Sequence, residues 1–157
     1  MTGTDRPDIL IFPPLAVGIA LVVAVALEWI LPIHILPPVL TGWSLVLGMV
    51  LVAIATILVV GGARTFTRSG TNVDPRKPAL KIIESGPYQY TRNPMYLGMV
   101  VLQFGLAFLF SLDWAILGGV VLWAVLHYGV VLREEAYLAG KFGGTYTDFT
   151  ARTRRWL

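Results

Sequence analysis

The sequence of 157 residues is 56% hydrophobic and 13% charged, whereas average soluble domains carry about 25% charged residues. This composition and a mean hydropathy of +0.73 indicate a single-domain integral membrane protein. No cysteine is present, so disulfides and thiolate catalysis are not expected. The two histidines, His34 and His127, are too few for most metal centres, and a net charge of +3 does not by itself indicate a nucleic-acid partner.

Four apolar runs follow in chain order, at residues 10–31, 42–62, 94–112 and 114–132. A helix needs about 20 apolar residues to cross a bilayer, so the sequence predicts an all-α membrane protein with four transmembrane helices. The regular part of the first run is expected to begin at Pro13-Pro14, and Gln103 interrupts the third run. The first run resembles a cleaved signal peptide at Ala24-Val25-Ala26, but its leader MTGTDRPD lacks the basic segment of such peptides.

All twelve lysines and arginines lie at run ends that share one side in a four-span arrangement. The other two connections, residues 32–41 and the turn around Asp113, contain none. The positive-inside rule therefore predicts that both termini and the loop between the second and third spans are cytoplasmic. We expect a protein of a bacterial or archaeal inner membrane whose functional site faces the cytoplasm, with most basic residues contacting anionic lipids.

The segment after Arg133 changes character from apolar to amphipathic. Glu134, Leu138 and Phe142 are spaced four apart and can share one helical face, and Gly143-Gly144 then breaks the helix. We expect the fourth helix to continue out of the membrane and turn into a short amphipathic tail on the membrane surface. The tail ends in RTRRWL, a basic and aromatic interface anchor.

The stretch ESGPYQYTRNPMYLG at residues 84–98 is polar and aromatic although it precedes an apolar run. Asn93 before Pro94 suits a helix cap followed by proline at the first helical position, so the third span is predicted to start at Pro94. A helix start beside Arg92 can bind a carboxylate or a phosphate. Alternatively, Arg92 reaches lipid phosphates and the tyrosines form an interfacial aromatic belt.

The third and fourth spans are joined by so short a link that they must form an antiparallel hairpin. Residues 92–96 and 133–135 are therefore expected to be neighbours, which brings basic, acidic and aromatic groups together. Within the hairpin, Gln103 lies about 13 Å and His127 about 9 Å from the cytoplasmic ends at ~1.5 Å per residue, and we expect them to face one cavity. His127 and Glu134, seven apart, should share a helix face. Alternatively, Gln103 and His127 hydrogen-bond to each other across the helices.

The sequence from GPYQYTRNPMYLG through REEAYLAGKFGGTYTDFTARTRRWL resembles the isoprenylcysteine carboxyl methyltransferase family, which also includes bacterial methyltransferases of phospholipids and other small lipids. The resemblance covers about residues 84–157, and the first two spans match only as apolar spans. It implies S-adenosylmethionine as cofactor at the cytoplasmic membrane face. It also implies a lipophilic substrate that arrives laterally from the bilayer.

The resemblance also implies site residues. The family's arginine-histidine-proline triplet falls on Arg92, Asn93 and Pro94, with asparagine where histidine is common. The rest of its pattern falls on Tyr96, Gly98, Glu134, Glu135 and Tyr146. No metal is implied.

The chemistry of these residues agrees with such a cofactor. Arg92 and the helix start suit its carboxylate, a glutamate suits its ribose diol, and the rings of tyrosines such as Tyr88 and Tyr90 suit adenine or the sulfonium. If the methyl acceptor is an amine or thiol, Glu134 or His127 is the candidate general base; a carboxylate acceptor needs none. Arg92, Glu134 and His127 are thus the candidate catalytic residues.

Two other functions remain open from the sequence. A membrane reductase resembling the sterol reductases would bind NADPH, with Arg152, Arg154 and Arg155 as candidates for its 2′-phosphate. A non-enzymatic scaffold or accessory subunit would have a packed hairpin without a cavity. Glu28 is functional or reaches the outer interface, and His34 is expected to have no catalytic role. The acceptor stays open among a prenyl-cysteine, an aminophospholipid, a quinone-like lipid and a small apolar thiol.

Overall fold

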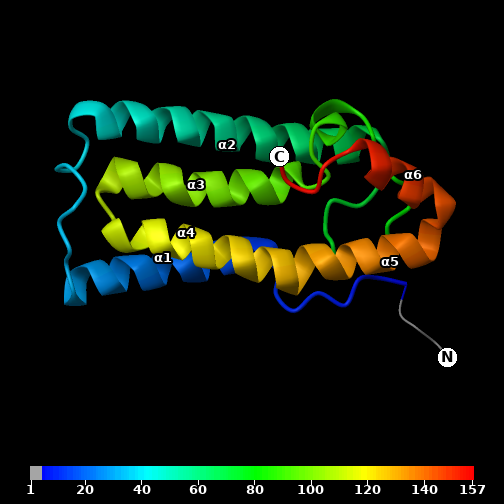
Figure 1. Ribbon diagram of the computed structural model, residues 1–157, viewed down its shortest axis with the longest axis horizontal. Helices are drawn as coiled ribbons and strands as arrows, with labels where there is room; N and C mark the ends of the chain where they lie inside the picture. Colours follow the sequence, from blue (N-terminus) through cyan, green and yellow to red (C-terminus); the bar gives the residue numbers. More distant parts are fainter. Residues whose placement is uncertain (1–4) are drawn as a thin grey trace.

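The computed structural model describes residues 5–157 and is built from helices (Figure 1). Their bounds are α1 Pro13–Ile30, α2 Gly42–Arg68, η1 Gly86–Gln89, α3 Pro94–Phe110, α4 Asp113–Leu126, η2 His127–Val131, α5 Leu132–Phe142 and α6 Gly144–Arg152. Within these residues there is no strand, and one isolated bridge pairs Thr91 with Arg154. The all-α class predicted from the sequence is confirmed.

Three helical segments are long and apolar enough to cross a membrane, namely α1, α2 and the continuous run Asp113–Phe142. The fourth apolar helix, α3, is shorter, at 17 residues. The predicted boundaries agree to a few residues, because proline fixes the starts of α1 and α3. The exception is α2, which continues from the predicted end at residue 62 to Arg68.

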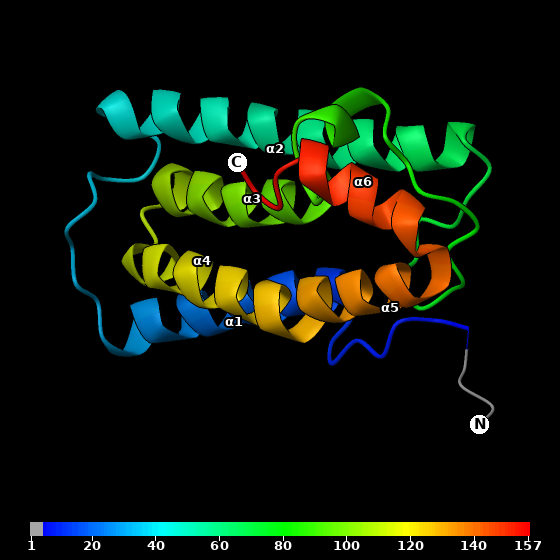
Figure 2. The same ribbon diagram turned by 45° about the vertical axis from the view of Figure 1, so that its right-hand side comes forward.

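Helix α3 occupies the centre of the bundle and packs against α2 on one side and α4 on the other, while α1 packs against α4 (Figures 1 and 2). Glycines let α2 and α3 approach closely. A β-carbon at Gly98 would stand 2.8 Å from Val59 Cγ2 and 3.0 Å from the Ala55 carbonyl oxygen. Because this space is filled by α2, Gly98 serves helix packing and does not contact the cavity described below.

The helix formed by α4 and α5 is interrupted by a π-helical turn, η2. A π-turn adds one residue to the helical repeat, which rotates the residues after it by roughly 100° relative to an α-helix. The seven-residue spacing of His127 and Glu134 therefore does not place them on one face. The expectation that these two side chains share a face is wrong for this reason.

The end of the bundle away from the basic residues is closed by the loop that joins α1 and α2. The backbone N–H groups of Ile35 and Leu36 donate to the Asp113 carboxylate at 3.2 and 2.9 Å. Glu28 Oε2 accepts a hydrogen bond from the Trp114 backbone N–H at 3.4 Å. These acids hold the start of α4 and the loop in place, which gives Glu28 a structural contact.

All twelve basic residues belong to the opposite end of the bundle. There the last turns of α2 lie beside the start of α3, α5 and α6 (Figure 1). The loop 69–85 crosses this end, and α6 folds back over it instead of extending away (Figure 2). The functional candidates of the sequence lie here.

Candidate functional site

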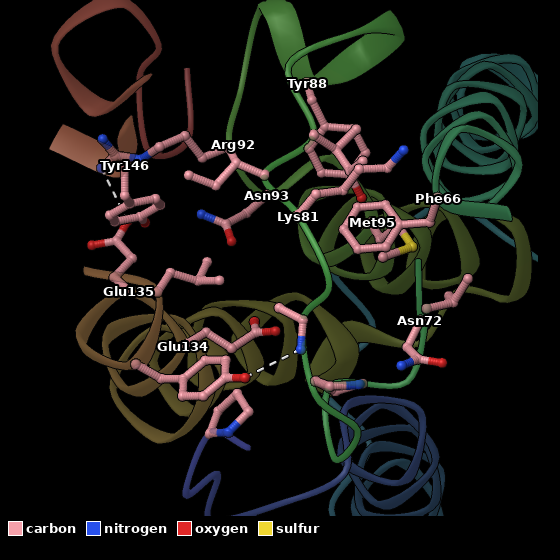
Figure 3. Close-up of a pocket in the computed structure, with 18 of the residues that line it drawn as sticks. Phe66, Asn72, Lys81, Tyr88, Arg92, Asn93, Met95, Glu134, Glu135 and Tyr146 are labelled. Carbon is pink, nitrogen blue, oxygen red and sulfur yellow. Dashed lines mark hydrogen bonds and ion pairs between the residues drawn. The ribbon is translucent and has the colours of Figure 1, made fainter. Parts of the chain in front are cut away.

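A cavity opens at the basic end of the bundle, between the last turns of α2, the first turn of α3 and α5 (Figure 3). Its walls surround about 810 Å³ of empty space, part of it open to solvent. Its charged and aromatic lining residues are Phe66, Asp74, Lys77, Lys81, Tyr88, Arg92, Tyr96, Glu134, Glu135, Tyr137, Tyr146 and Phe149. Charged groups of both signs beside aromatic rings suit a ligand that is itself charged and aromatic.

Arg92 and Glu135 form a partly buried ion pair in this cavity. Arg92 Nη2 lies 3.0 Å from Glu135 Oε1, and both side chains are largely shielded from solvent. Arg155 binds the same carboxylate through Nε and Nη2, with Nη2 2.8 Å from Oε2. Two guanidinium groups against one carboxylate leave one positive charge, so the cluster still attracts an anion.

The guanidinium of Arg92 is not fully engaged by these contacts. Its Nη1 donates to the Thr150 carbonyl oxygen at 3.2 Å, but its buried Nε has no partner among the described residues. The hydrogen bond to Glu135 also raises the pKa of Arg155. From the sequence, we expected the Arg92 guanidinium to be available for a ligand anion. In the structure, this guanidinium pairs with Glu135, and only its Nε remains as a donor without a partner among the described residues.

Tyr96 and Glu134 form the second polar pair of the cavity. The Tyr96 hydroxyl donates to Glu134 Oε2 at 2.7 Å. No ion pair reaches Glu134 within the described part of the chain. Glu134 is thus a cavity carboxylate held by one phenol, whereas Glu135 is held by two arginines.

The chain end fixes the segment before α3. Arg92 N–H donates to the Arg154 carbonyl oxygen at 2.9 Å, and Asn93 Nδ2 donates to that of Arg155 at 2.9 Å. Asn93 is the residue at the helix N-cap, but its side chain does not cap the helix because it is turned toward Arg155. Pro94 is fully buried directly behind it. The expected capping hydrogen bond is therefore replaced by a bond to the tail.

The C-terminal tail contributes to the cavity. Tyr146 and Phe149 of α6 are buried against the cavity, and burial raises the pKa of the Tyr146 phenol, with Glu135 adding to the effect. The short amphipathic tail expected from the sequence therefore also forms one wall of the site, because α6 packs over the cavity.

Four predicted site residues are not in the cavity lining. They are Pro94, which is buried behind Asn93, and the three residues described next. Tyr90 is 78% exposed, and Gly98 packs against α2. His127 accepts a hydrogen bond at Nδ1 from Trp156 Nε1 at 3.2 Å and stacks on Trp123. The π-turn directs His127 toward the chain end, so it does not join the cavity lining.

Gln103 does not meet His127 either. It is fully buried in α3, and neither of its amide atoms has a hydrogen-bond partner among the described residues. Its Nε2 lies 3.2 Å from the position that a β-carbon of Gly118 would take. The shared cavity and the direct bond that the sequence suggested for these two residues are both absent.

Sequence reasoning missed the wall supplied by α2 and the loop 69–85. Phe66 of α2 and Asn72 and Lys81 of the loop line the cavity (Figure 3), and Tyr137 accepts a hydrogen bond from the Ala79 N–H at 3.2 Å. The sequence did contain a signal for this wall. The apolar run ends at residue 62 although helix-forming residues follow it, and the next loop is rich in prolines and polar residues. The basic residues of this loop were interpreted only as determinants of topology.

The fold and the site together define a membrane-type helical protein with a polar, aromatic cavity at one end of its bundle. Residues 43–145 match the phospholipid methyltransferase family, PEMT, and the chain belongs to this family. The family expected from the sequence is thereby confirmed, and methyl transfer is its class of activity. An "Uncharacterized protein" of Haemophilus influenzae is 32% identical over 63 residues, which are 40% of this chain and 100% of that protein.

Proposed function

We propose that this protein is an S-adenosylmethionine-dependent methyltransferase that acts on a lipophilic acceptor at the cytoplasmic face of the membrane. The observation that carries the proposal is the meeting of Arg92, Glu135, Tyr96 and Glu134 in one cavity within the family region. An anion-binding group, two carboxylates and aromatic rings are the partners that the ends of this cofactor require.

The proposal includes four membrane spans with both termini in the cytoplasm. Helix α3 is about 25 Å long at ~1.5 Å per residue, which a bilayer can accommodate with modest thinning. The placement of all basic residues at one end supports this orientation through the positive-inside rule. A bacterial or archaeal inner membrane fits the same rule.

The cavity residues fit S-adenosylmethionine on two independent grounds. The hydroxyl of Tyr88 and the Nε of Arg92 are buried and lack partners among the described residues, so a ligand with acceptor atoms would satisfy both. Burial raises the pKa of Tyr88, which keeps its phenol a neutral donor. The excess positive charge around Glu135 suits a carboxylate.

When bound, S-adenosylmethionine supplies an electrophilic methyl group on a sulfonium. The protein's task is then to align donor and acceptor and to exclude water. Arg92 holds the anionic end, Arg155 adds positive charge beside it through Glu135, and α6 with the loop 69–85 covers the cavity. Glu134, oriented by Tyr96, binds the cofactor or takes the proton of an amine or thiol acceptor.

The reductase alternative has weaker support. Of the three arginines that could hold a 2′-phosphate, Arg152 pairs with Glu84 at 2.9 Å and Arg155 with Glu135 at 2.8 Å. The scaffold alternative predicts a hairpin without a cavity, and a cavity is present.

The test is ligand-dependent stability of the purified protein in detergent. A ligand that binds only the folded state raises the melting temperature. We expect stabilisation by S-adenosylhomocysteine and none by NADPH. Stabilisation by NADPH alone would favour the reductase, and no shift with either would favour the scaffold. Membrane lipid extracts incubated with labelled S-adenosylmethionine would then identify the acceptor.

A further inference from the structure

Residues 5–8, called the strap from here on, lie along α5 on the way to α1 (Figures 1 and 2). The strap is held by three residues spaced four apart on one face of α5, which are Arg133, Tyr137 and Lys141. Arg133 Nη1 lies 3.4 Å from Asp8 Oδ2, and Lys141 Nζ lies 2.6 Å from Asp5 Oδ1. The hydrogen bond from Lys141 lowers the pKa of Asp5, so this carboxylate is charged at neutral pH.

The strap forms part of the cavity wall. Pro7 is buried and belongs to the cavity lining together with Tyr137. The Tyr137 hydroxyl accepts a hydrogen bond from the Ala79 N–H at 3.2 Å and donates one to Asp5 Oδ1 at 2.8 Å. One phenol thus ties the strap to the loop 69–85, and the strap closes the cavity on the side between α5 and this loop.

The residues that follow the strap are fixed to the bundle. Leu10 N–H donates to the Gly129 carbonyl oxygen of η2 at 2.9 Å. Ile9 and Ile11 pack against the main hydrophobic core cluster. These residues give the strap a firm pivot at its α1 end.

The strap itself is attached much more weakly than its pivot. Its ion pairs run through Asp5 and Asp8, whose side chains are 60% and 99% exposed. Exposed pairs contribute little to stability and are screened by salt. The strap can therefore detach from α5 while the pivot stays in place, and Pro7 then leaves the cavity wall.

We propose that the strap is a lid of the cavity, which detaches from α5 to let a ligand enter or leave and closes between these events. A methyltransferase must exclude water during the reaction and still exchange its cofactor after each turnover, and a weakly held lid on a firm pivot meets both needs. The inference rests on the proposed function for the identity of the ligand, whereas the motion of the strap can be measured without a ligand.

The first test measures that motion by thiol labelling of the purified, detergent-solubilised protein. The sequence has no cysteine, so Pro7→Cys introduces a single thiol at a buried position. A polar maleimide should label it more slowly than Asp148→Cys, which lies at an exposed position of α6. Adding Asp5→Asn to Pro7→Cys should raise the labelling rate about two- to fivefold, because it removes one exposed ion pair. Adding Asp148→Asn, the matched control that removes an equal charge, should leave the rate unchanged.

The second test locks the strap. Asp5→Cys and Lys141→Cys are combined and joined by a short, reducible bifunctional thiol reagent after S-adenosylhomocysteine has bound. Dissociation of this ligand should nearly stop, and reduction should restore it.

A disulfide at the pivot is the matched control for the locked strap. A β-carbon at Gly129 would stand 3.6 Å from Leu10 Cβ, and disulfides join β-carbons about 3.5–4.5 Å apart. Leu10→Cys combined with Gly129→Cys should therefore form a disulfide that leaves dissociation unchanged, because the strap moves beyond this point. Melting temperature and gel-filtration profile verify that each variant is folded.

The possible failures are distinguishable. If the unmodified protein does not bind S-adenosylhomocysteine, the proposed function is overturned, and the labelling of Pro7→Cys still decides whether the strap opens. If folded Pro7→Cys reacts as fast as Asp148→Cys, or does not react at all, the strap is not a lid. If the joined protein releases S-adenosylhomocysteine as fast as the unjoined one, the ligand leaves by another route, and the lid is wrong while the methyl-donor site stands.

Discussion

The Tyr96 hydroxyl donates a 2.7 Å hydrogen bond to Glu134 Oε2, joining the first turn of α3 to the first turn of α5. Each residue belongs to a different side of the helical hairpin, so the bond exists only when the hairpin is fully formed. Substitutions at Tyr96 and Glu134 therefore test whether the hairpin forms the proposed site.

Glu134→Gln keeps the size of the side chain and removes its charge. We expect methyl transfer to fall by roughly 10²-fold or more if Glu134 is the general base. Tyr96→Phe should cause a smaller loss, about tenfold, because it removes one hydrogen bond to a charged group. Labelled methyl incorporation into lipid gives the rate, and S-adenosylhomocysteine binding separates affinity from turnover.

Tyr90→Phe is the matched control for Tyr96→Phe. Tyr90 belongs to the same sequence motif but is 78% exposed and lies outside the cavity, so its hydroxyl should be dispensable. Wild-type rate and affinity in Glu134→Gln would show that this carboxylate has no part in the reaction. A defect in Tyr90→Phe equal to that in Tyr96→Phe would contradict the placement of the site.

The ion pairs of Glu135 lead to a stability prediction. Glu135→Ala leaves Arg92, whose side chain is 11% exposed, without its counterion, and breaking such a pair costs about 3–5 kcal/mol. Arg152→Ala breaks a pair in which the arginine is 65% exposed, and such exposed pairs contribute about 0–1 kcal/mol. The free energy of unfolding, measured with denaturant in mixed micelles, should show this order. Equal losses in the two variants would mean that the Glu135 cluster is open to water.

The chain end supports a third prediction. Residues 154 and 155 supply the carbonyl oxygens bonded by Arg92 N–H and by Asn93 Nδ2. Deleting residues 153–157 should abolish S-adenosylhomocysteine binding. Helical content by circular dichroism should stay near the wild-type value because every helix ends before residue 153, while the loss of Trp156, which packs against the core, should lower the melting temperature. Deleting Leu157 alone, 82% exposed, is the control and should have no effect. Full binding by the longer deletion would exclude the tail from the site.

Part of this site could be predicted from the sequence because local chemistry determined it. Asparagine followed by proline sets the start of α3 at Pro94, and the short link before Asp113 makes a hairpin unavoidable. Those two facts are enough to bring Arg92 to Glu135. The family resemblance follows from the same residues, and the family match confirms it.

The remainder depended on features that a periodic pattern does not encode. One π-turn at His127–Val131 rotates everything before it relative to Glu134, and removed His127 from the expected group. The cavity lining by Phe66 of α2 and by Asn72 and Lys81 of the following loop depends on tertiary contacts that fix the path of the loop, such as the hydrogen bond from Ala79 N–H to Tyr137. Asn93 does not cap α3 through Oδ1, because its side chain is turned so that Nδ2 donates to the distant Arg155 carbonyl oxygen.

Gln103 supports a fourth prediction, which concerns stability rather than chemistry. Its amide is completely buried among apolar helices, and neither polar atom has a partner among the described residues. A buried polar group without a hydrogen bond costs about 1–3 kcal/mol, so Gln103→Met, which preserves length and volume, should raise the free energy of unfolding by a similar amount. The affinity for S-adenosylhomocysteine should not change, since Gln103 is absent from the cavity lining.

The matched control for Gln103→Met tests its neighbour. Gly118→Ala would place a β-carbon 3.2 Å from Gln103 Nε2, and it should therefore destabilise the wild-type protein. The same substitution should be better tolerated in the Gln103→Met background, because the flexible thioether can move away. Thermal unfolding of the two single variants and the double variant measures this coupling directly. If Gln103→Met destabilises the protein or stops methyl transfer while the fold is intact, the amide has a partner in the working enzyme, and its burial without one is not the functional state.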